Sequence, residues 1–408
     1  MFNRNSLVAA LSAVGMLSLS GAALAQQVVV SGGATLPLPL YQDEITNFPA
    51  PTFYSYVGTG SGTGKTAFLG NTPASFGRTG AVHWIGSDSI LTAAQISDYL
   101  TTGLGKVGNP TGHGPLIQIP SVGTPVTISY KGPAGDVTLT KAQLCGVLSG
   151  SISTWSALGV ASGSAPNDFK VIYRSESSGT SELLTRHLQA VCGSDSAIAF
   201  SGKSTFAQEF PSSTPPANFI AATGSAGVAS AVNAQASAIT YLSPDPAFTV
   251  QLKQASLVNR NDSATYAPTS ENVSAALGST QALPPANGPI ERNPTGANWG
   301  NVNNQANPFN WVRQSVDPAA GYPIVGYTNF VLSQCYTDAA VANAIKSFLT
   351  THYSVANSAP DTGEVDKHKL VPLTPVNRNR VLAAFVTGTT ANLNINNATT
   401  CGSYAGRG

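Results

Sequence analysis

The sequence predicts an α/β protein of two lobes, in which each lobe is a mainly parallel sheet flanked by helices. Short apolar runs alternate with segments of helical spacing along most of the chain. The 408 residues exceed what one hydrophobic core usually organises. Three loops also join the end of a predicted strand to small residues and the start of a helix. Ligands of such sheets lie beyond the carboxyl ends of the strands, so we expect the functional site at these loops.

The first 25 residues read as a cleavable signal peptide. Arg4 gives a basic start, residues 7–19 are mostly apolar, and Ala23-Leu24-Ala25 offers a small-x-small cleavage pattern. The alternative is an N-terminal membrane anchor, but the apolar run is too short to span a bilayer. We therefore expect cleavage after Ala25 and a soluble protein, without membrane insertion, that is periplasmic or secreted.

The charge balance excludes a broad electrostatic binding surface. The chain has 20 basic and 19 acidic residues, and removal of the signal peptide takes away Arg4 only, which leaves 19 of each. A nucleic-acid binder would normally carry a clustered basic surplus, so no nucleic-acid partner is expected. Any anion bound by this chain must be held by local groups.

Four cysteines in an exported chain predict disulfides, although four residues permit three pairings. We favour Cys145–Cys192 and Cys335–Cys401, because each pair would staple one half of the chain. No C-x-x-C spacing is present, which argues against a redox or zinc role. The five histidines show no metal-ligand spacing either, so no metal and no cofactor are predicted; they are His83, His113, His187, His352 and His368.

The elements of the first lobe are predicted mainly before residue 118. Strands are expected at residues 28–30, 53–57 and 82–85, because these runs are apolar and rich in β-formers. A helix follows Pro37, which suits a first helical turn, and another begins at Thr66 after a glycine-rich loop.

An extended, proline-containing segment at residues 116–130 is a candidate crossover into a second lobe, expected at residues 119–248. There we predict helices at 141–148, 154–158 and 181–191, and strands at 169–173 and 238–242. Residues 249–408 are expected to return to the first lobe, with a strand at 324–332 and helices at 339–350 and 376–385. Residues 281–320, rich in Pro, Asn and Gly, interrupt the pattern as a long loop or a subdomain.

The three loops that could bind an anion are residues 32–37, 58–62 and 174–180. Their small side chains let backbone N–H groups approach an anion, their hydroxyls add donors, and the helix N-terminus adds favourable potential. One such loop alone is more often a simple helix cap. Three in one chain favour an anion site.

The second loop also suggests a nucleotide-binding P-loop. That pattern ends correctly at Gly64-Lys65-Thr66 but needs glycine where Thr59 stands. No acidic strand motif for magnesium accompanies it, so the nucleotide interpretation is not favoured.

Two charged residues accompany the loops. Arg174 could form a forked contact with an oxyanion, or an ordinary ion pair with Glu176. Asp88 would repel a bound anion unless the ligand carries a proton. Phosphate near neutral pH keeps an O–H that can donate to Asp88, whereas sulfate has none and would meet an unpaired negative charge. A capping role for Asp88 is the alternative.

At these residues the sequence resembles the phosphate-binding subunit of bacterial phosphate ABC importers, and still more closely the DING proteins. The matching stretches cover nearly the whole mature chain outside residues 281–320. They are GGATLPLPLY from Gly32, YVGTGSGTGK from Tyr56, GSDS from Gly86 and RSESSGTSELLTRHL from Arg174, with weaker matches at AITYLSPD from Ala238 and YPIVGYTNFVL from Tyr322.

The resemblance implies a type II periplasmic-binding-protein fold that closes on phosphate in a cleft between its lobes. The implied ligands are Thr35, Leu36 through its N–H, Ser61, Asp88, Arg174, Ser178, Gly179 and Thr180. Two departures are present. The chain has VVVS before Gly32 and not the Asp-Ile-Asn-Gly that names the DING group, and Glu176 stands where importer subunits commonly have Asp.

The leading expectation is therefore a monomeric, non-catalytic binder of inorganic phosphate for uptake or scavenging, with a phosphate ABC permease as the implied partner. The alternative is a secreted alkaline phosphatase of the DING type, in which Ser61 or Thr180 would attack and His83 would assist. A third possibility is an extracellular interaction protein that retains the fold as a scaffold.

Overall fold

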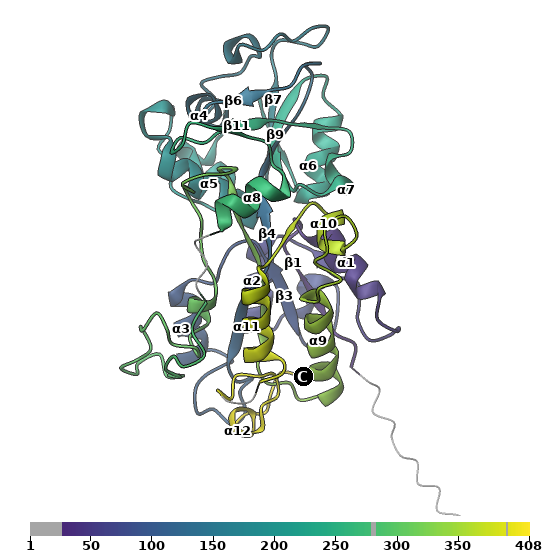
Figure 1. Ribbon diagram of the computed structural model, residues 1–408, viewed down its shortest axis with the longest axis vertical. Coiled ribbons are helices and arrows are strands. Elements are labelled where there is room, and N and C mark those ends of the chain that lie inside the picture. The colour runs from purple at the N-terminus through teal and green to yellow at the C-terminus, as the bar shows by residue number, and fades with distance from the viewer. Residues whose placement is uncertain (1–26, 279–282, 389–390) are drawn as a thin grey trace, which may run out of the picture.

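The computed structural model describes residues 27–278, 283–388 and 391–408, and the predicted signal peptide lies outside this part of the chain. Two lobes are stacked along the long axis of the molecule, and each is built on its own sheet (Figure 1). No helix in the described ranges is both long enough and apolar enough to cross a membrane.

The sheet of the first lobe has six strands. Strand β1 pairs in parallel with β2 and β3, while β13, β4 and β14 extend the sheet with antiparallel pairs. The order is β14 (Val371–Pro372), β4 (Leu116–Pro125), β13 (Val325–Ser333), β3 (Trp84–Ser87), β1 (Ser31–Gly33) and β2 (Val57–Gly58).

The sheet of the second lobe has five strands. Strand β7 pairs in parallel with β8 and β9, and β5 joins antiparallel to β9 and β10. The order is β10 (Lys253–Gln254), β5 (Thr127–Lys131), β9 (Ala238–Leu242), β7 (Lys170–Arg174) and β8 (Phe219–Ala222). A small third sheet contains β12 (Thr265–Tyr266), β11 (Ser256–Val258) and β6 (Thr138–Leu139). The predicted two-lobed α/β fold class is confirmed.

The chain crosses between the two sheets at Val126. There the N–H of Val126 donates at 2.8 Å to the carbonyl of Ile324, the residue before β13, and the Tyr322 hydroxyl donates to the carbonyl of Val126 at 3.2 Å. The predicted boundaries after residues 118 and 248 differ from this sheet membership. Strand β4 stays in the first sheet to Pro125, and β10 pairs with β5 of the second lobe.

Helices flank both sheets (Figure 1). In the first lobe they are α1 (Leu38–Thr46), α2 (Ser61–Gly70), α3 (Ala93–Thr101), α9 (Ala339–His352), α10 (Glu364–Lys367), α11 (Pro375–Phe385) and α12 (Ala398–Cys401). In the second lobe they are α4 (Lys141–Ser149), α5 (Gly179–Val191), α6 (Gly224–Asn233) and α7 (Pro246–Thr249), and α8 (Ser270–Leu277) packs on β4 and β13. Local capping explains several starts: Thr92 with Gln95, and Thr140 with Gln143, form capping boxes at α3 and α4.

Helix α2 begins at Ser61, five residues before its predicted start. The glycines that suggested a loop occupy its first turn, where they allow close packing. A Cβ on Gly62 would lie 2.2 Å from the Ser177 hydroxyl oxygen, and one on Gly64 would lie 2.7 Å from the Gly33 Cα. Tertiary contact therefore overrides the low helix propensity of glycine here.

Both favoured disulfides are present. Cys145–Cys192 joins α4 to the end of α5 in the second lobe, and Cys335–Cys401 joins the segment after β13 to α12 in the first.

The described part of the 281–320 segment forms a long loop that packs on the first lobe and, through Val316, also contacts His187 of the second lobe. It contains one 3₁₀ turn at Pro308–Trp311, and the Trp311 ring packs edge-on against Phe385 of α11. Asparagine amides hold the loop through backbone carbonyls, as where the Asn310 side chain donates to Asn301 and Asn304.

Candidate anion-binding site

Three loops of the first lobe end at the seam between the lobes. Thr35 and Leu36 follow β1, Ser61 begins α2 after β2, and Asp88 follows β3. Because β1, β2 and β3 are adjacent parallel strands, their carboxyl ends meet at one edge of the sheet. The backbone N–H of Asp88 donates to the Ser61 hydroxyl at 3.1 Å, which ties two of these loops together.

The second lobe contributes the segment from Arg174 to Thr180. Arg174 is the last residue of β7, and α5 begins at Gly179. Ser178 caps this helix by accepting from the N–H of Ser181 at 3.2 Å. The first N–H groups of a helix have no partner within it, so the starts of α2 and α5 present donors and positive potential.

The two sets of loops are in direct contact. The Thr180 hydroxyl donates to Asp88 across the seam at 3.0 Å, and the N–H of Gly62 donates to the carbonyl of Ser177 at 3.2 Å. A Cβ on Gly179 would lie 2.4 Å from the Ser61 hydroxyl oxygen and 2.7 Å from the Asp88 Cβ. Only glycine permits this approach, so position 179 is fixed by the closeness of the two lobes.

The Thr35–Leu36 loop also touches the second lobe. The Thr35 hydroxyl lies 3.1 Å from the hydroxyl of Ser225 and accepts from its N–H at 3.1 Å. The Ser243 hydroxyl donates to the carbonyl of Leu36 at 3.0 Å. All eight residues proposed from the sequence therefore gather at the seam, four from each lobe.

Asp88 is the only one of the eight with a carboxylate, and it is 3% exposed. It accepts from Thr180 and from Thr328 of β13, the latter at 2.5 Å. Burial raises the pKa of Asp88 above its ordinary value, although the two threonine hydroxyls and nearby Arg174 act in the opposite direction. The Asp88 carboxylate is therefore a buried acceptor surrounded by hydrogen-bond donors.

Arg174 is almost fully buried, with 2% exposure, so its contact with Glu176 is not an ordinary surface ion pair. Its Nε donates to Glu176 Oε1 at 2.8 Å, and its Nη2 contacts the same oxygen. Glu176 also accepts from the N–H of Gly224 at 3.1 Å. Glu176, whose side chain is longer than the Asp common in importer subunits, therefore orients the Arg174 guanidinium. It also joins the Arg174 loop to the start of α6.

Sequence reasoning missed three residues of the seam: Thr328, Ser225 and Ser243. Ser225 had a detectable signal, since β8, Thr223-Gly224 and α6 repeat the strand, small-residue turn and helix pattern of the three proposed loops. Thr328 lies in the weakly matching stretch from Tyr322, but it is one hydroxyl within an apolar strand and nothing nearby marks it as a site residue. Its contact with Asp88 depends on the pairing of β13 with β3.

His83 does not assist at this site. Its Nδ1 accepts from the N–H of Val30 at 2.8 Å, and the residue is 2% exposed. Burial, with a smaller effect of Arg407, lowers the pKa of His83 to about 4. The ring is therefore neutral, and it accepts a hydrogen bond from Val30, the residue that precedes β1. Lys65 of the P-loop-like stretch donates to the carbonyl of Ile90 at 3.3 Å.

A second group has the order of a hydrolytic triad. The Ser121 hydroxyl lies 2.9 Å from His352 Nε2, and His352 Nδ1 lies 2.8 Å from Glu44 Oε1. All three residues are at most 2% exposed, and Tyr41 also donates to Ser121 at 3.0 Å. A substrate cannot reach this hydroxyl, so the group serves to join α1, β4 and α9.

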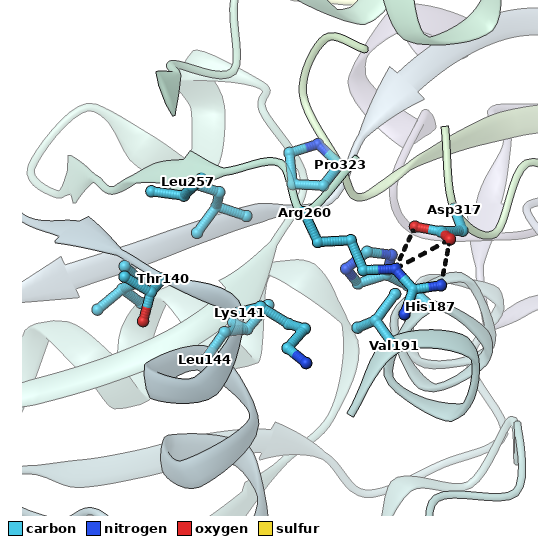
Figure 2. A pocket seen from close by; sticks show the side chains of 11 residues that line it. Thr140, Lys141, Leu144, His187, Val191, Leu257, Arg260, Asp317 and Pro323 are labelled. Carbon is cyan, nitrogen blue, oxygen red and sulfur yellow. Dashed lines mark hydrogen bonds and ion pairs between the residues drawn. The ribbon is translucent and has the colours of Figure 1, made fainter. Parts of the chain in front are cut away.

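A hollow beside α4 and α5 (Figure 2) is lined by none of the residues of the anion loops. It measures about 10 Å³ and is lined mainly by apolar atoms. His187 reaches it but is bound through Nδ1 to the carbonyl of Val316 at 2.8 Å, and Arg260 pairs with Asp317. These contacts indicate a packing role for His187.

Donor-lined loops that face each other across two α/β lobes define a two-lobed solute-binding protein. The chain belongs to the PBP superfamily, because the family model described as a PBP superfamily domain matches residues 20–281.

Relatives with similarity over nearly the whole chain carry two kinds of name. Alkaline phosphatase L of Pseudomonas aeruginosa strain PAO1 is 39% identical over 407 residues, which cover 98% of each chain. The structure of a phosphate-binding protein from Stenotrophomonas maltophilia has a TM-score of 0.78 and 39% identity, covering 94% of this chain and 100% of that one. A high-affinity periplasmic phosphate-binding protein of the DING group, solved with phosphate bound, has a TM-score of 0.74 and 36% identity with coverage of 94% and 100%. The resemblance seen in the sequence is confirmed.

Proposed function

We propose that this protein captures inorganic phosphate in the seam between its lobes. The observation that carries the proposal is the Asp88 carboxylate, which is buried among donors from both lobes. The names of the similar structures support the same ligand. A carboxylate at this place suits an anion that brings its own proton, and phosphate near neutral pH does so.

The roles of the other residues follow from their chemistry. Hydroxyls of Thr35, Ser61 and Ser178 donate to phosphate oxygens, as do the N–H groups of Leu36 and Gly179. The Thr180 hydroxyl, which donates to Asp88 in this structure, turns to a phosphate oxygen when the ligand binds. Arg174, oriented by Glu176, supplies a forked charged donor. Asp88 accepts from two threonines, and an ionised carboxylate has about four acceptor positions, so it can also accept the O–H of the ligand.

Binding is feasible in a chain without net positive charge because the donors are preformed. Burying an anion costs a large desolvation free energy, which hydrogen bonds from fixed groups offset. The starts of α2, α5 and α6 reach the seam, and each adds positive potential at its first turn.

Calorimetric titration of phosphate and sulfate tests the proposal. Wild type should bind phosphate strongly and sulfate weakly. Asp88→Asn should weaken phosphate binding by roughly tenfold to a hundredfold and reduce the preference over sulfate, because one hydrogen bond to a charged group is lost. Asp136→Asn, at an exposed surface carboxylate, is the control and should bind like wild type. Equal affinity of wild type for both anions would contradict the role of Asp88.

The name of the Pseudomonas relative favours a second candidate, hydrolysis of phosphomonoesters. Release of p-nitrophenol from p-nitrophenyl phosphate by wild type, and its loss in Asp88→Asn and Arg174→Ala, would support hydrolysis at the same seam. Activity that persists in both variants would instead point to a contaminating enzyme.

We further infer that the protein is exported, as one similar structure is of a periplasmic protein. Cleavage after Ala25 would be seen by N-terminal sequencing of the processed chain. Fractionation of periplasm and culture medium under phosphate starvation distinguishes delivery to a permease from release, and size-exclusion chromatography tests the expected monomer.

A further inference from the structure

A second polar cluster lies at the seam, where α1 and α10 of the first lobe approach α7 of the second (Figure 1). It contains Asp43 of α1, Glu364 of α10 and His368, which follows α10. One ligand atom from each of the three lies within 4.8 Å of the other two. No local pattern in the sequence predicts this group, since more than 300 positions separate Asp43 from the other two residues.

The orientation of His368 points to a ligand. Its Nδ1 lies 2.7 Å from Asp245 Oδ2, so this nitrogen carries the proton and donates to the carboxylate. The other nitrogen, Nε2, is buried and faces Asp43 Oδ2 at ion-pair distance, but no residue in the described ranges is placed to make a hydrogen bond with it, and His368 is 8% exposed. A carboxylate that holds the far side of an imidazole is the usual arrangement around a metal-bound histidine.

The spacing of the donors also fits a cation. His368 Nε2 lies 3.2 Å from Asp43 Oδ2. Two ligands that bind one ion at ~2.0–2.1 Å in tetrahedral geometry are roughly 3.3 Å apart. Glu364 Oε1 is paired with Lys367 at 2.8 Å, which leaves Oε2 as its donor.

We propose that Asp43, Glu364 and His368 Nε2 bind a divalent transition cation, with Asp245 as the residue that positions the imidazole. One nitrogen and two carboxylate oxygens suit Zn²⁺ or Mn²⁺ and leave further positions for water. The cluster is separate from the phosphate loops, and cation binding does not depend on the proposed function.

The position of Asp245 couples this site to the lobes. It caps α7 in the second lobe, whereas the three ligands belong to the first. Two residues before it, Ser243 donates to the carbonyl of Leu36 in the anion loop. Closure of the lobes therefore brings Asp245 to His368, and cation and phosphate should each tighten the binding of the other. This coupling alone rests on the proposed function.

Competition with a chromophoric chelator tests the site, with Zn²⁺ and Mn²⁺ titrated separately into the untagged protein without phosphate. Asp43→Asn and Glu364→Gln change side chains that are partly exposed and should fold normally, and each should weaken binding by about tenfold or more. Asp245→Asn should weaken it by roughly tenfold to a hundredfold. Asp136→Asn, at a carboxylate distant in sequence and exposed, should match wild type.

Wild type that binds neither ion, or Asp43→Asn and Glu364→Gln that bind as wild type does, would overturn the proposal and leave His368 as a proton-bearing bridge between two aspartates. Arg174→Ala separates the two functions, because it should lose phosphate binding and keep the cation. If the wild type fails to bind phosphate but binds the cation, and the cation-site variants weaken that binding, the cation site stands and only the coupling is removed.

Discussion

Asp88 shows how burial can serve selectivity at the scale of one residue. Its carboxylate is removed from water and stabilised by Thr180, Thr328 and nearby Arg174. Burial outweighs these contacts, so the pKa of Asp88 is raised and its charged form is costly. The protein thus holds a carboxylate that gains from accepting a proton, as from the O–H of a phosphate ion.

The raised pKa predicts how selectivity depends on pH. Above this pKa Asp88 is ionised and repels sulfate. As the pH falls through it, Asp88 gains a proton, becomes a donor and ceases to exclude sulfate. Sulfate affinity should therefore rise on acidification, starting at a higher pH than the ordinary aspartate value of about 3.9 implies. Titrations of sulfate from neutral pH downward measure this, with Asp88→Asn as a control that should lack this contribution. If the sulfate affinity of the wild type rises no more on acidification than that of Asp88→Asn, the assignment is contradicted.

Thr328 offers a second test at a residue that the motifs did not reveal. Thr328→Val removes the hydroxyl that donates to Asp88 but preserves the shape of the side chain. Loss of a hydrogen bond to a charged group should weaken phosphate binding by about tenfold or more, as measured by calorimetry. Thr124→Val is matched, since this buried threonine on β4 donates only to the carbonyl of Pro125 and should leave affinity unchanged. Equal effects of both substitutions would show that Thr328 acts through packing.

The anion loops could be chosen from the sequence because each has its own local pattern, and the resemblance to phosphate-binding proteins then implied the individual ligands. Thr328 and Ser243 could not be chosen in this way. They reach the seam through strand pairing and lobe contact, and neither is encoded by neighbouring residues.

At the scale of elements, the anion loops lead directly into the first turns of α2 and α5, and these turns pack closely against the opposite lobe. Gly62 and Gly179 allow α2 and α5 to meet almost without intervening side chains. The sequence predicted the loops and the following helices, but it placed the start of α2 too late. The deciding contacts come from the other lobe, as between Gly62 and Ser177, and glycine content alone suggests a loop.

Gly179→Ala tests this packing. The added methyl group would overlap with Ser61 and Asp88, so it should hinder closure of the lobes while each lobe stays folded. A strain of ~1–3 kcal/mol corresponds to phosphate binding weakened by roughly fivefold to more than a hundredfold.

Titration calorimetry and urea unfolding distinguish affinity from stability in this variant. Gly227→Ala in α6 is the matched control, because its new Cβ would meet no atom within 4 Å. Gly179→Ala with unchanged affinity would mean that the lobes need not approach this closely.

At the scale of the whole molecule, two lobes and both disulfide pairings could be predicted from length, alternation and cysteine spacing. The point at which the chain returns from the second lobe to the first could not be predicted, because β10 and β12 have only two residues each and show no periodicity. The Asp43, Glu364 and His368 cluster was equally hidden, since only the packing of α1 against α10 assembles it.

The central claim is that both lobes hold one phosphate ion between Asp88 and the Arg174–Thr180 segment. Arsenate has the same shape and also carries a proton, and its arsenic atom can be located by anomalous diffraction in crystals of the protein. The account predicts a peak whose oxygen shell lies within hydrogen-bonding distance of Asp88, Arg174 and Thr180. A fully occupied peak elsewhere, with none at the seam, would contradict it.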